Sequence, residues 1–333
     1  MMNVFGVKDI KVRVRSRLNG LHRDAGWYLG TNRRFYGNAK GSRIVVYHGV
    51  CHKDPLRFNT IFITAKTLEL QLQLYKKYFH IVSLDDCYQQ RFDPERFNLC
   101  LSFDDGFANN HKYVLPLLNK YDIPATFFIT AIRHAGYDVL WNDVLNIAFR
   151  YGPANFVFGQ EEFSRQKDRG YVSSLTGKRF ADMLRSTGFE QKAEMLRLLD
   201  FVKQKADPDY WRQMTDEEIR NLSASKWVTI GSHGYYHNDL AKIPVASAKD
   251  EMIKSKQWLE NITGKEIKSL AFPYGSYSKE LVEEAKKIGY SQLLATEHLL
   301  PGHANNELLK QRLTINPFIS NINQLHANIT GSY

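Results

Sequence analysis

The stretch LCLSFDDG at residues 99–106 is an apolar run that ends in two adjacent carboxylates and a glycine. Neighbouring side chains of a regular strand point to opposite faces, so Asp104 and Asp105 can serve one site only where the strand ends and the chain turns. Gly106 permits that turn. Enzymes built on parallel strands place functional groups at the carboxyl ends of those strands. Taken alone, the pair fits equally well a solvated turn that caps a helix near 109–121.

Short β-branched and aromatic runs alternate with helical patterns along most of the chain, which predicts strand–helix units. Helices are expected at 64–78, 247–262 and 278–288, and Ser247 and Asp250 stand at capping-box spacing in the second of them. Strands are expected at 43–47, 81–84, 99–103, 125–130, 227–230, 268–272 and 292–295. The predicted fold class is α/β, a distorted (β/α)7-type barrel with parallel strands and a helical insertion.

The chain is expected to divide into a basic N-terminal arm, one large α/β domain and a C-terminal tail, at 1–41, 42–320 and 321–333. Residues 137–222 interrupt the strand–helix alternation. They carry helical patterns, for example at 189–205, and a Thr215–Glu218 capping box, but few strand patterns. We therefore expect an inserted helical subdomain there.

The composition narrows the class of protein. With 333 residues and 43% apolar side chains, the chain can bury a sizeable core. The three cysteines, Cys51, Cys87 and Cys100, are odd in number and lack CxxC spacing, so neither a disulfide framework nor a thiolate zinc site is indicated. No run approaches the roughly 18 apolar residues of a membrane span, and the first residues lack the pattern of a secretory signal. These features predict a soluble protein of the reducing cytoplasm.

The formal net charge of +10 would suit an anionic partner such as nucleic acid, an acidic glycan, a phosphate-bearing lipid carrier or a membrane face. Because the basic residues are spread along the chain and do not alternate with aromatics, surface solvation explains most of this charge. No nucleic-acid partner is expected. The basic arm can approach anionic lipids, which adds a peripheral position on the inner membrane face to the predicted location.

Two histidines follow a second predicted strand. The stretch WVTIGSHGYYH at 227–237 runs from a strand into a turn, with His233 and His237 four residues apart. If the chain coils after Ser232, both imidazoles lie within reach of one cation. Two imidazoles and one carboxylate leave positions open for water and substrate, as catalytic metal sites do. The sequence therefore predicts a divalent metal site formed by Asp105, His233 and His237.

Two further strand ends carry weaker patterns. The stretch AFPYG at 271–275 is a strand stopped by proline and glycine, and such a loop can fix a backbone N–H toward a developing oxyanion. Pro-x-Gly turns are also frequent without any function. The stretch IVVYHG at 44–49 ends in His48, which would reach the same mouth, although a partly exposed turn histidine explains it as well.

With SFDDG at 102–106, SHGYYH at 232–237 and AFPYG at 271–275 in this order, the chain resembles the polysaccharide deacetylase family, whose NodB-homology domain defines carbohydrate esterase family 4. The resemblance covers about 40–320, with the insertion as an interruption. It implies a carbohydrate N-deacetylase, a hydrolase that cleaves the amide of an N-acetylated sugar or glycan. The expected cytoplasmic location favours a substrate linked to a lipid or nucleotide. The resemblance also implies a divalent metal ion, Zn²⁺ first, with Co²⁺, Ni²⁺ and Mn²⁺ as alternatives.

The resemblance also implies residue roles. Asp104 would be the general base, Asp105, His233 and His237 the metal ligands, and the Tyr274 N–H part of an oxyanion hole. Two other functions are compatible with the same motifs: a catalytically inactive glycan-binding domain and a deformylase of a formylated amino sugar. The first would be marked by a missing ligand or base, and the sequence lacks neither.

The chain departs from the family pattern at two motifs. Gly234 stands where the family usually has Ser or Thr, so a hydrogen bond to the metal site is either missing or supplied from elsewhere. Many members have an arginine before the proline of the third motif, where this chain has Leu270 and Phe272. An arginine that orients the base then either comes from another segment, with Arg312 in a late strand at 311–315 as the candidate, or is absent.

The catalytic acid has three candidates. Many members of the family place an acid histidine late in the chain, which would be His298 or His303 here. The YHGV stretch at 47–50 instead resembles the subgroup of poly-N-acetylglucosamine deacetylases, where such a strand supplies the acid. On this resemblance we predict His48 as the acid.

Overall fold

The computed structural model describes residues 7–296, 302 and 306–333 of the chain. His298 and His303, two of the three candidate acids, lie outside the described residues. The three cysteines are free and buried. Among the described residues, no helix combines the length and apolar character that crossing a membrane requires.

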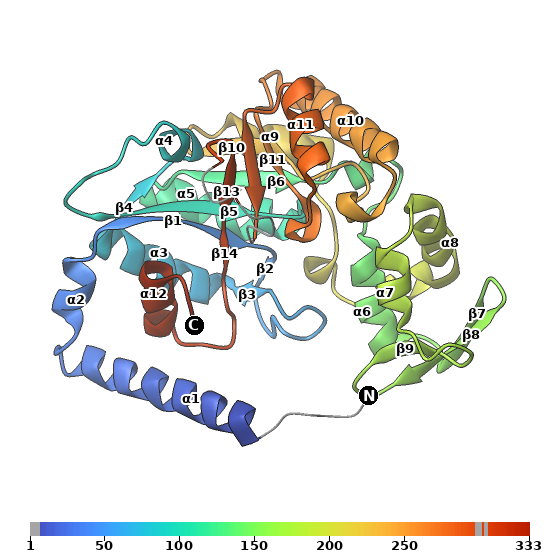
Figure 1. Ribbon diagram of the computed structural model, residues 1–333, viewed down its shortest axis with the longest axis horizontal. Helices are drawn as coiled ribbons and strands as arrows, with labels where there is room; N and C mark the ends of the chain where they lie inside the picture. Colours follow the sequence, from blue (N-terminus) through green and yellow to red (C-terminus); the bar gives the residue numbers. More distant parts are fainter. Residues whose placement is uncertain (1–6, 297–301, 303–305) are drawn as a thin grey trace.

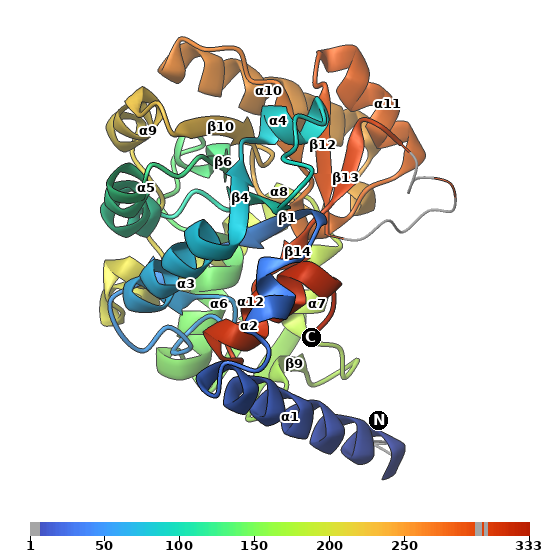
Figure 2. The same ribbon diagram turned by 90° about the vertical axis from the view of Figure 1, so that its left-hand side faces the viewer.

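A parallel sheet that nearly closes on itself forms the centre of the fold (Figures 1 and 2). Its strands are β1 (Gly41–Tyr47), β4 (Phe79–Val82), β5 (Phe97–Phe103), β6 (Ala125–Ile129), β10 (Val228–Ser232), β11 (Ser269–Ala271), β12 (Gln292–Ala295), β13 (Leu309–Gln311) and β14 (Leu313–Thr314). Hydrogen-bonded neighbours follow the order β13-β12-β11-β10-β6-β5-β1-β14, with β4 paired to β5. The predicted fold class, a distorted (β/α)7-type barrel, is confirmed.

The last strand segment joins the two ends of this path. Leu309–Gln311 pairs with β12, and Leu313–Thr314 pairs with β1, with only Arg312 between them. A Leu293–Leu309 pair and a Val45–Leu313 pair fix the two registers. One continuous stretch therefore bridges the first and the last strands of the barrel.

Each of the seven expected strands is present, displaced by at most two residues at either end. β5 is buried along its whole length, as expected for a parallel strand that is covered on both faces. It pairs with β1 on one side, and with β4 and then β6 on the other. The strand that carries the two carboxylates is thus held between three others.

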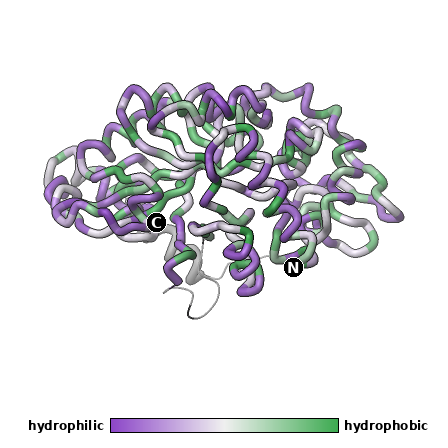
Figure 3. Tube along the Cα trace, turned by 90° about the horizontal axis from the view of Figure 1, so that it is seen from above, coloured by the Kyte–Doolittle hydropathy of each residue, from purple (hydrophilic) through white to green (hydrophobic). Residues whose placement is uncertain are grey.

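Helices cover the outside of the barrel, as the sequence predicts, and Figure 3 shows their hydrophilic outer stretches around a more hydrophobic interior. Thr64 and Ser278 cap two of them by accepting hydrogen bonds from the backbone, and the Thr215–Glu218 capping box is formed. The expected Ser247–Asp250 capping box is not used, because that helix begins one turn earlier, after Pro244. The barrel helices are α3 (Ala65–Tyr78), α5 (Leu115–Tyr121), α9 (Asp216–Ala224), α10 (Val245–Thr263) and α11 (Lys279–Ile288).

The predicted insertion contains helices and also a three-stranded antiparallel sheet that the sequence did not indicate. In β8 only Phe163 is buried, so the strand lacks the alternation that marks a half-buried strand. Phe156, Phe163 and Phe180 pack together beneath this sheet in a cluster separate from the barrel core. The elements of this region are α6 (Trp141–Tyr151), β7 (Asn155–Phe158), β8 (Glu161–Gln166), β9 (Gly170–Ser173), α7 (Phe180–Arg185) and α8 (Phe189–Leu199).

Helices lie near both ends of the part of the chain that the structure describes. The predicted arm contains α1 (Val7–Tyr28) and α2 (Arg33–Gly37), and the predicted tail forms α12 (Asn321–Thr330). Figure 2 shows α1 along the edge of the molecule, beside α12. Arg23 Nε donates to Asn323 Oδ1 at 2.6 Å, which ties the first helix to the last.

Gly231 in β10 offers a test of this packing. A Cβ at Gly231 would lie 2.5 Å from both Phe128 Cε1 and Ser269 Oγ, closer than real contacts allow. We expect Gly231→Ala to lower the free energy of unfolding by roughly 1–3 kcal/mol. Gly37→Ala, whose Cβ would meet nothing within 4 Å, should change it by less than about 0.5 kcal/mol. Urea unfolding followed by circular dichroism measures both, and equal stabilities would contradict the tight packing of β10.

Candidate metal centre and active site

The two carboxylates lie where β5 ends. The Asp104 N–H donates to Tyr47 O at 2.9 Å, which continues the pairing with β1 by one residue. Asp105 and Gly106 then have φ values of 77° and 81°, so the chain turns at once and the two side chains need not face opposite ways. Both aspartates are buried.

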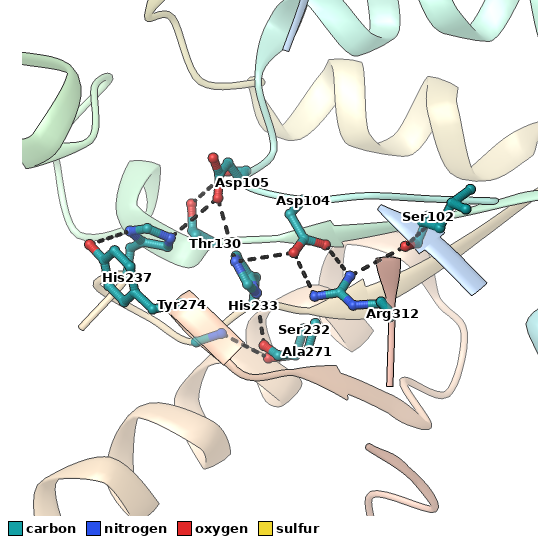
Figure 4. Close-up of polar contacts among 12 residues, drawn as sticks. Ser102, Asp104, Asp105, Thr130, Ser232, His233, His237, Ala271, Tyr274 and Arg312 are labelled. Atoms are coloured by element: carbon teal, nitrogen blue, oxygen red, sulfur yellow. Dashed lines mark hydrogen bonds and ion pairs between the residues drawn. The ribbon is translucent and has the colours of Figure 1, made fainter. Parts of the chain in front are cut away.

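His233 and His237 face Asp105 at the end of β10 (Figure 4). Their Nε2 atoms lie 3.4 and 3.2 Å from Asp105 Oδ1, and one ligand atom from each of the three residues lies within 4.8 Å of the others. His233 Nδ1 lies 2.8 Å from the Ala271 carbonyl, so this nitrogen donates a hydrogen bond and Nε2 keeps its lone pair. His237 Nδ1 lies 3.3 Å from Tyr274 Oη, which can accept in the same way. The donor set fits a divalent cation.

Electrostatics favour the ionised form of Asp105. Burial raises the pKa of this carboxyl, but hydrogen bonds from His233 and His237 outweigh burial and hold the pKa well below its usual range. Thr130 Oγ1 donates to the Asp105 carbonyl at 3.0 Å and fixes the backbone behind the carboxylate. A charged carboxylate in a set direction is the form that a metal ligand requires.

Arg312 binds Asp104 through both carboxylate oxygens. Nη1 lies 2.6 Å from Oδ1 and Nη2 lies 2.7 Å from Oδ2, a fork geometry that fixes the plane of the carboxylate. Burial raises the pKa of Asp104, but Arg312 and His233 outweigh burial and hold the pKa below its usual range. The contact expected between the base and an arginine from 311–315 is therefore present.

Three residues of the site have left-handed backbones that only glycine adopts easily. Asp105, His237 and Tyr274 have φ values of 77°, 56° and 61°. Among the described residues, these are three of the six non-glycine residues with positive φ. Such conformations cost free energy and persist where the surrounding contacts enforce them, often at functional sites.

Tyr274 and His48 complete the set of predicted residues. The Tyr274 N–H has no hydrogen-bond acceptor among the described residues, so it is free to bind an oxyanion. His48 follows β1 and is half-buried, and its carbonyl accepts from Asn110 Nδ2 at 3.0 Å. Burial lowers the pKa of the His48 imidazole, while the charges of Asp105 and Asp104 act in the opposite direction. All six predicted site residues thus lie at the same end of the barrel, and their roles stay predictions.

A buried polar network that the sequence did not reveal holds the histidine loop. Glu251 of α10 accepts from the Tyr236 N–H at 3.0 Å and from Asn238 Nδ2 at 2.6 Å. Lys192 of α8 donates to Asn238 Oδ1, and Arg185 Nε donates to Asp239 at 2.9 Å. The inserted subdomain therefore anchors the loop that carries the two histidines. A buried lysine inside a helical pattern gives no indication of such a contact in the sequence.

The same loop explains the departure at Gly234. This residue has a φ of 77°, where the Ser or Thr usual in the family would be strained. The Gly234 N–H donates to Ser232 Oγ at 3.3 Å, and Ser232 Oγ contacts Ser255 Oγ at 2.8 Å. The Ser232 hydroxyl thus links the residue after His233 to α10.

Two buried polar atoms beside the site have no hydrogen-bond partner in the part of the chain that the structure describes. They are Oδ2 of Asp143 and Nε2 of Gln213. Burial raises the pKa of Asp143 well above its usual range, and the charge of Asp105 raises it further. A neutral carboxylic acid and an amide can both bind hydroxyl groups.

The fold and the site together define an α/β-barrel protein with a candidate metal centre at the carboxyl ends of its strands. A family model described as polysaccharide deacetylase matches residues 93–293. The match spans more than half of the chain, which therefore belongs to the polysaccharide deacetylase family. It includes the three motifs but neither His48 nor Arg312.

Known relatives agree with this family. YxkH of Bacillus subtilis, named as a polysaccharide deacetylase, is 28% identical over 94 residues, which are 28% of this chain and 32% of that protein. The chain thus matches about a third of the length of this relative. The deacetylase PplD of Streptococcus pyogenes, solved with acetate, has a TM-score of 0.54 at 18% identity, covering 87% of this chain and 99% of that one. IcaB of Ammonifex degensii has a TM-score of 0.51 at 16% identity, covering 88% and 98%. These structures share the fold.

Lys192, which holds the histidine loop, should make the free energy of unfolding depend on pH. Burial lowers the pKa of Lys192 from 10.5 to about 8, so between these values the unfolded chain binds more protons than the folded one. The contribution of Lys192 to the free energy of unfolding should therefore rise between pH 8 and 10.5, by up to roughly 3 kcal/mol. Lys192→Met should lose this rise. Urea unfolding of both proteins in chelator across this range measures the difference, and parallel pH profiles would contradict the buried charge.

Proposed function

We propose that this protein is a metal-dependent hydrolase that removes the acetyl group from the nitrogen of an amino sugar in a glycan or glycan precursor. The observation that carries the proposal is the position of ionised Asp104 beside the Asp105–His233–His237 cluster. Membership of the polysaccharide deacetylase family supports carbohydrate deacetylation as the reaction. The nitrogen and oxygen donors support Zn²⁺ as the first choice of metal, with Co²⁺, Ni²⁺ or Mn²⁺ as alternatives.

Asp105, His233 and His237 would hold the ion, which when bound supplies a Lewis acid for the amide carbonyl and lowers the pKa of a water. Asp104 accepts the proton of the attacking water, and the Arg312 fork keeps the accepting carboxylate in its plane. The free Tyr274 N–H donates to the former carbonyl oxygen as negative charge gathers there. His48, in its protonated form, gives a proton to the departing amine.

Replacing each aspartate separates metal binding from proton transfer. Asp104→Asn should retain the metal and lower kcat by about 10²–10⁴-fold. Asp105→Ala should lose both metal and activity, because two imidazoles alone hold the ion weakly. Asp250→Asn, an exposed change on α10, is the matched control.

The measurements are metal content by mass spectrometry after dialysis and acetate release from N-acetylated chitooligosaccharides and diphosphate-linked N-acetylamino sugars. Metal-loaded Asp105→Ala with normal turnover would refute the ligand set. Formate release in place of acetate would make the protein a deformylase. Sugar binding without any acyl release would make it an inactive glycan-binding domain.

The acid role of His48 can be isolated by the leaving group. His48→Ala should lower kcat for an N-acetylated sugar by about 10²-fold or more, since an amine leaves only when protonated. The same variant should cleave 4-nitrophenyl acetate almost as fast as the wild type, because nitrophenolate departs without a proton. Full activity of His48→Ala on the sugar would transfer the role to His298 or His303.

A further inference from the structure

A basic cleft lies outside the metal centre, between the inserted subdomain and the connection from β2 (Val50–Cys51) to β3 (Ile63–Thr64). Its volume is about 830 Å³, and it is bounded by residues 56–60, α6, β8, β9 and the start of α7. Figure 1 shows β8 and β9 at the end of α6 that points away from the barrel. One carboxylate, from Asp168, lines it against six cations: Arg57, Arg150, Arg165, Lys167, Arg169 and Arg179.

Most of these cations are held in place without being neutralised. In the part of the chain that the structure describes, no ion pair involves Arg150, Arg165, Lys167 or Arg169, whereas Arg57 pairs with Asp54 and Arg179 with Asp182. Backbone carbonyls hold the guanidinium groups instead. Arg165 Nη1 donates to Phe149 O at 3.2 Å, and Arg169 Nη2 donates to Gly177 O at 2.9 Å. Each guanidinium has five N–H donors, so most donors and the whole charge remain available to a ligand.

The cleft also has aromatic lining residues and one wall that lies toward the metal centre. Phe58, Phe149 and Tyr171 line it between the cations. Asn59 Nδ2 contacts Asp143 Oδ1 at 3.4 Å behind this wall, and Asp143 lies close enough to Asp105 to feel its charge. Asp143 and Arg150 belong to the same helix, about 10 Å apart along its axis. The cleft therefore lies near the metal centre.

We propose that this cleft binds a diphosphate group. Several guanidinium forks surround one concavity. A diphosphate, with its many oxygens and multiple charge, matches them better than a ligand with a single carboxylate does. A membrane face would need an open surface, and duplex nucleic acid would need an extended stripe, whereas this site is a cleft of limited volume. The assignment of the diphosphate to the substrate, as the link between an N-acetylamino sugar and a nucleoside or a lipid, rests on the proposed function.

Titration calorimetry with inorganic pyrophosphate tests the cleft without any turnover. The full chain should bind pyrophosphate, with an affinity that falls as salt rises, and Arg165→Glu/Arg169→Glu should weaken binding about tenfold or more. Arg220→Glu/Lys226→Glu, two exposed cations outside the cleft with the same change in net charge, should leave binding nearly unchanged. Asp105→Ala should still bind pyrophosphate, which excludes the metal centre as the pyrophosphate site. Equal binding by the cleft variant and the control, or no binding by the wild type, overturns the proposal.

Further arms identify the source of the diphosphate. Competition by a nucleoside-diphosphate N-acetylamino sugar, or by a polyprenyl-diphosphate sugar in phosphatidylcholine vesicles, would assign one carrier or the other. Binding to phosphatidylglycerol vesicles that pyrophosphate does not displace would make the surface a membrane contact and refute the proposal.

Turnover separates this proposal from the proposed function. Arg165→Glu/Arg169→Glu should raise KM for a diphosphate-linked substrate and leave acetate release from chitooligosaccharides unchanged. If neither substrate releases acetate, the proposed function fails, and pyrophosphate binding still decides the cleft.

Discussion

The buried pair of Arg312 and Asp104 is the interaction on which the barrel and its site both depend. It joins residues 208 positions apart in the chain, at the point where β13 passes into β14. Breaking such a pair leaves a buried charge without its partner, which typically costs 3–5 kcal/mol. The guanidinium also lies over the Phe128 ring, 5.3 Å from its centroid, so it is packed as well as paired. The same ion pair therefore helps to close the barrel and orients the candidate base.

The inserted subdomain has a structural role at the site in addition to any contact with substrate. The histidine loop leaves β10 through left-handed residues, and such a turn does not hold itself. Lys192 and Arg185 reach it from the insertion, and Glu251 reaches it from the barrel side. Because the loop is held from both sides, the two imidazoles face Asp105 even though their backbone is strained. Changes in the insertion can therefore alter metal affinity from a distance.

The sequence predicted those parts of the molecule that leave a local pattern. The apolar runs at 99–103 and 227–230 end in the residues that meet at the site, because parallel strands bring their carboxyl ends to one edge. Arg312 is predictable because the third motif lacks its usual arginine and a late strand can bring one to the same site. The strands β7 to β9 are not predicted by the sequence, because they are short and mostly exposed. The predicted tail forms the helix α12. The sequence also gives no indication of the contacts of Asp143 and Lys192, because their partners are far away in sequence.

The fold gathers basic residues whose clustering neither the net charge nor the sequence indicates. Along the sequence the basic residues are spread out, and they indicate little beyond a solvated surface. The β8–β9 hairpin then brings Arg165, Lys167 and Arg169 opposite Arg57 and Arg150, from segments far apart in the chain. Like charges gathered around a concavity repel one another, and a bound anion relieves that repulsion. Among the described residues Arg150, Arg165, Lys167 and Arg169 have no ion-pair partner, and the proposed diphosphate would relieve the repulsion between them.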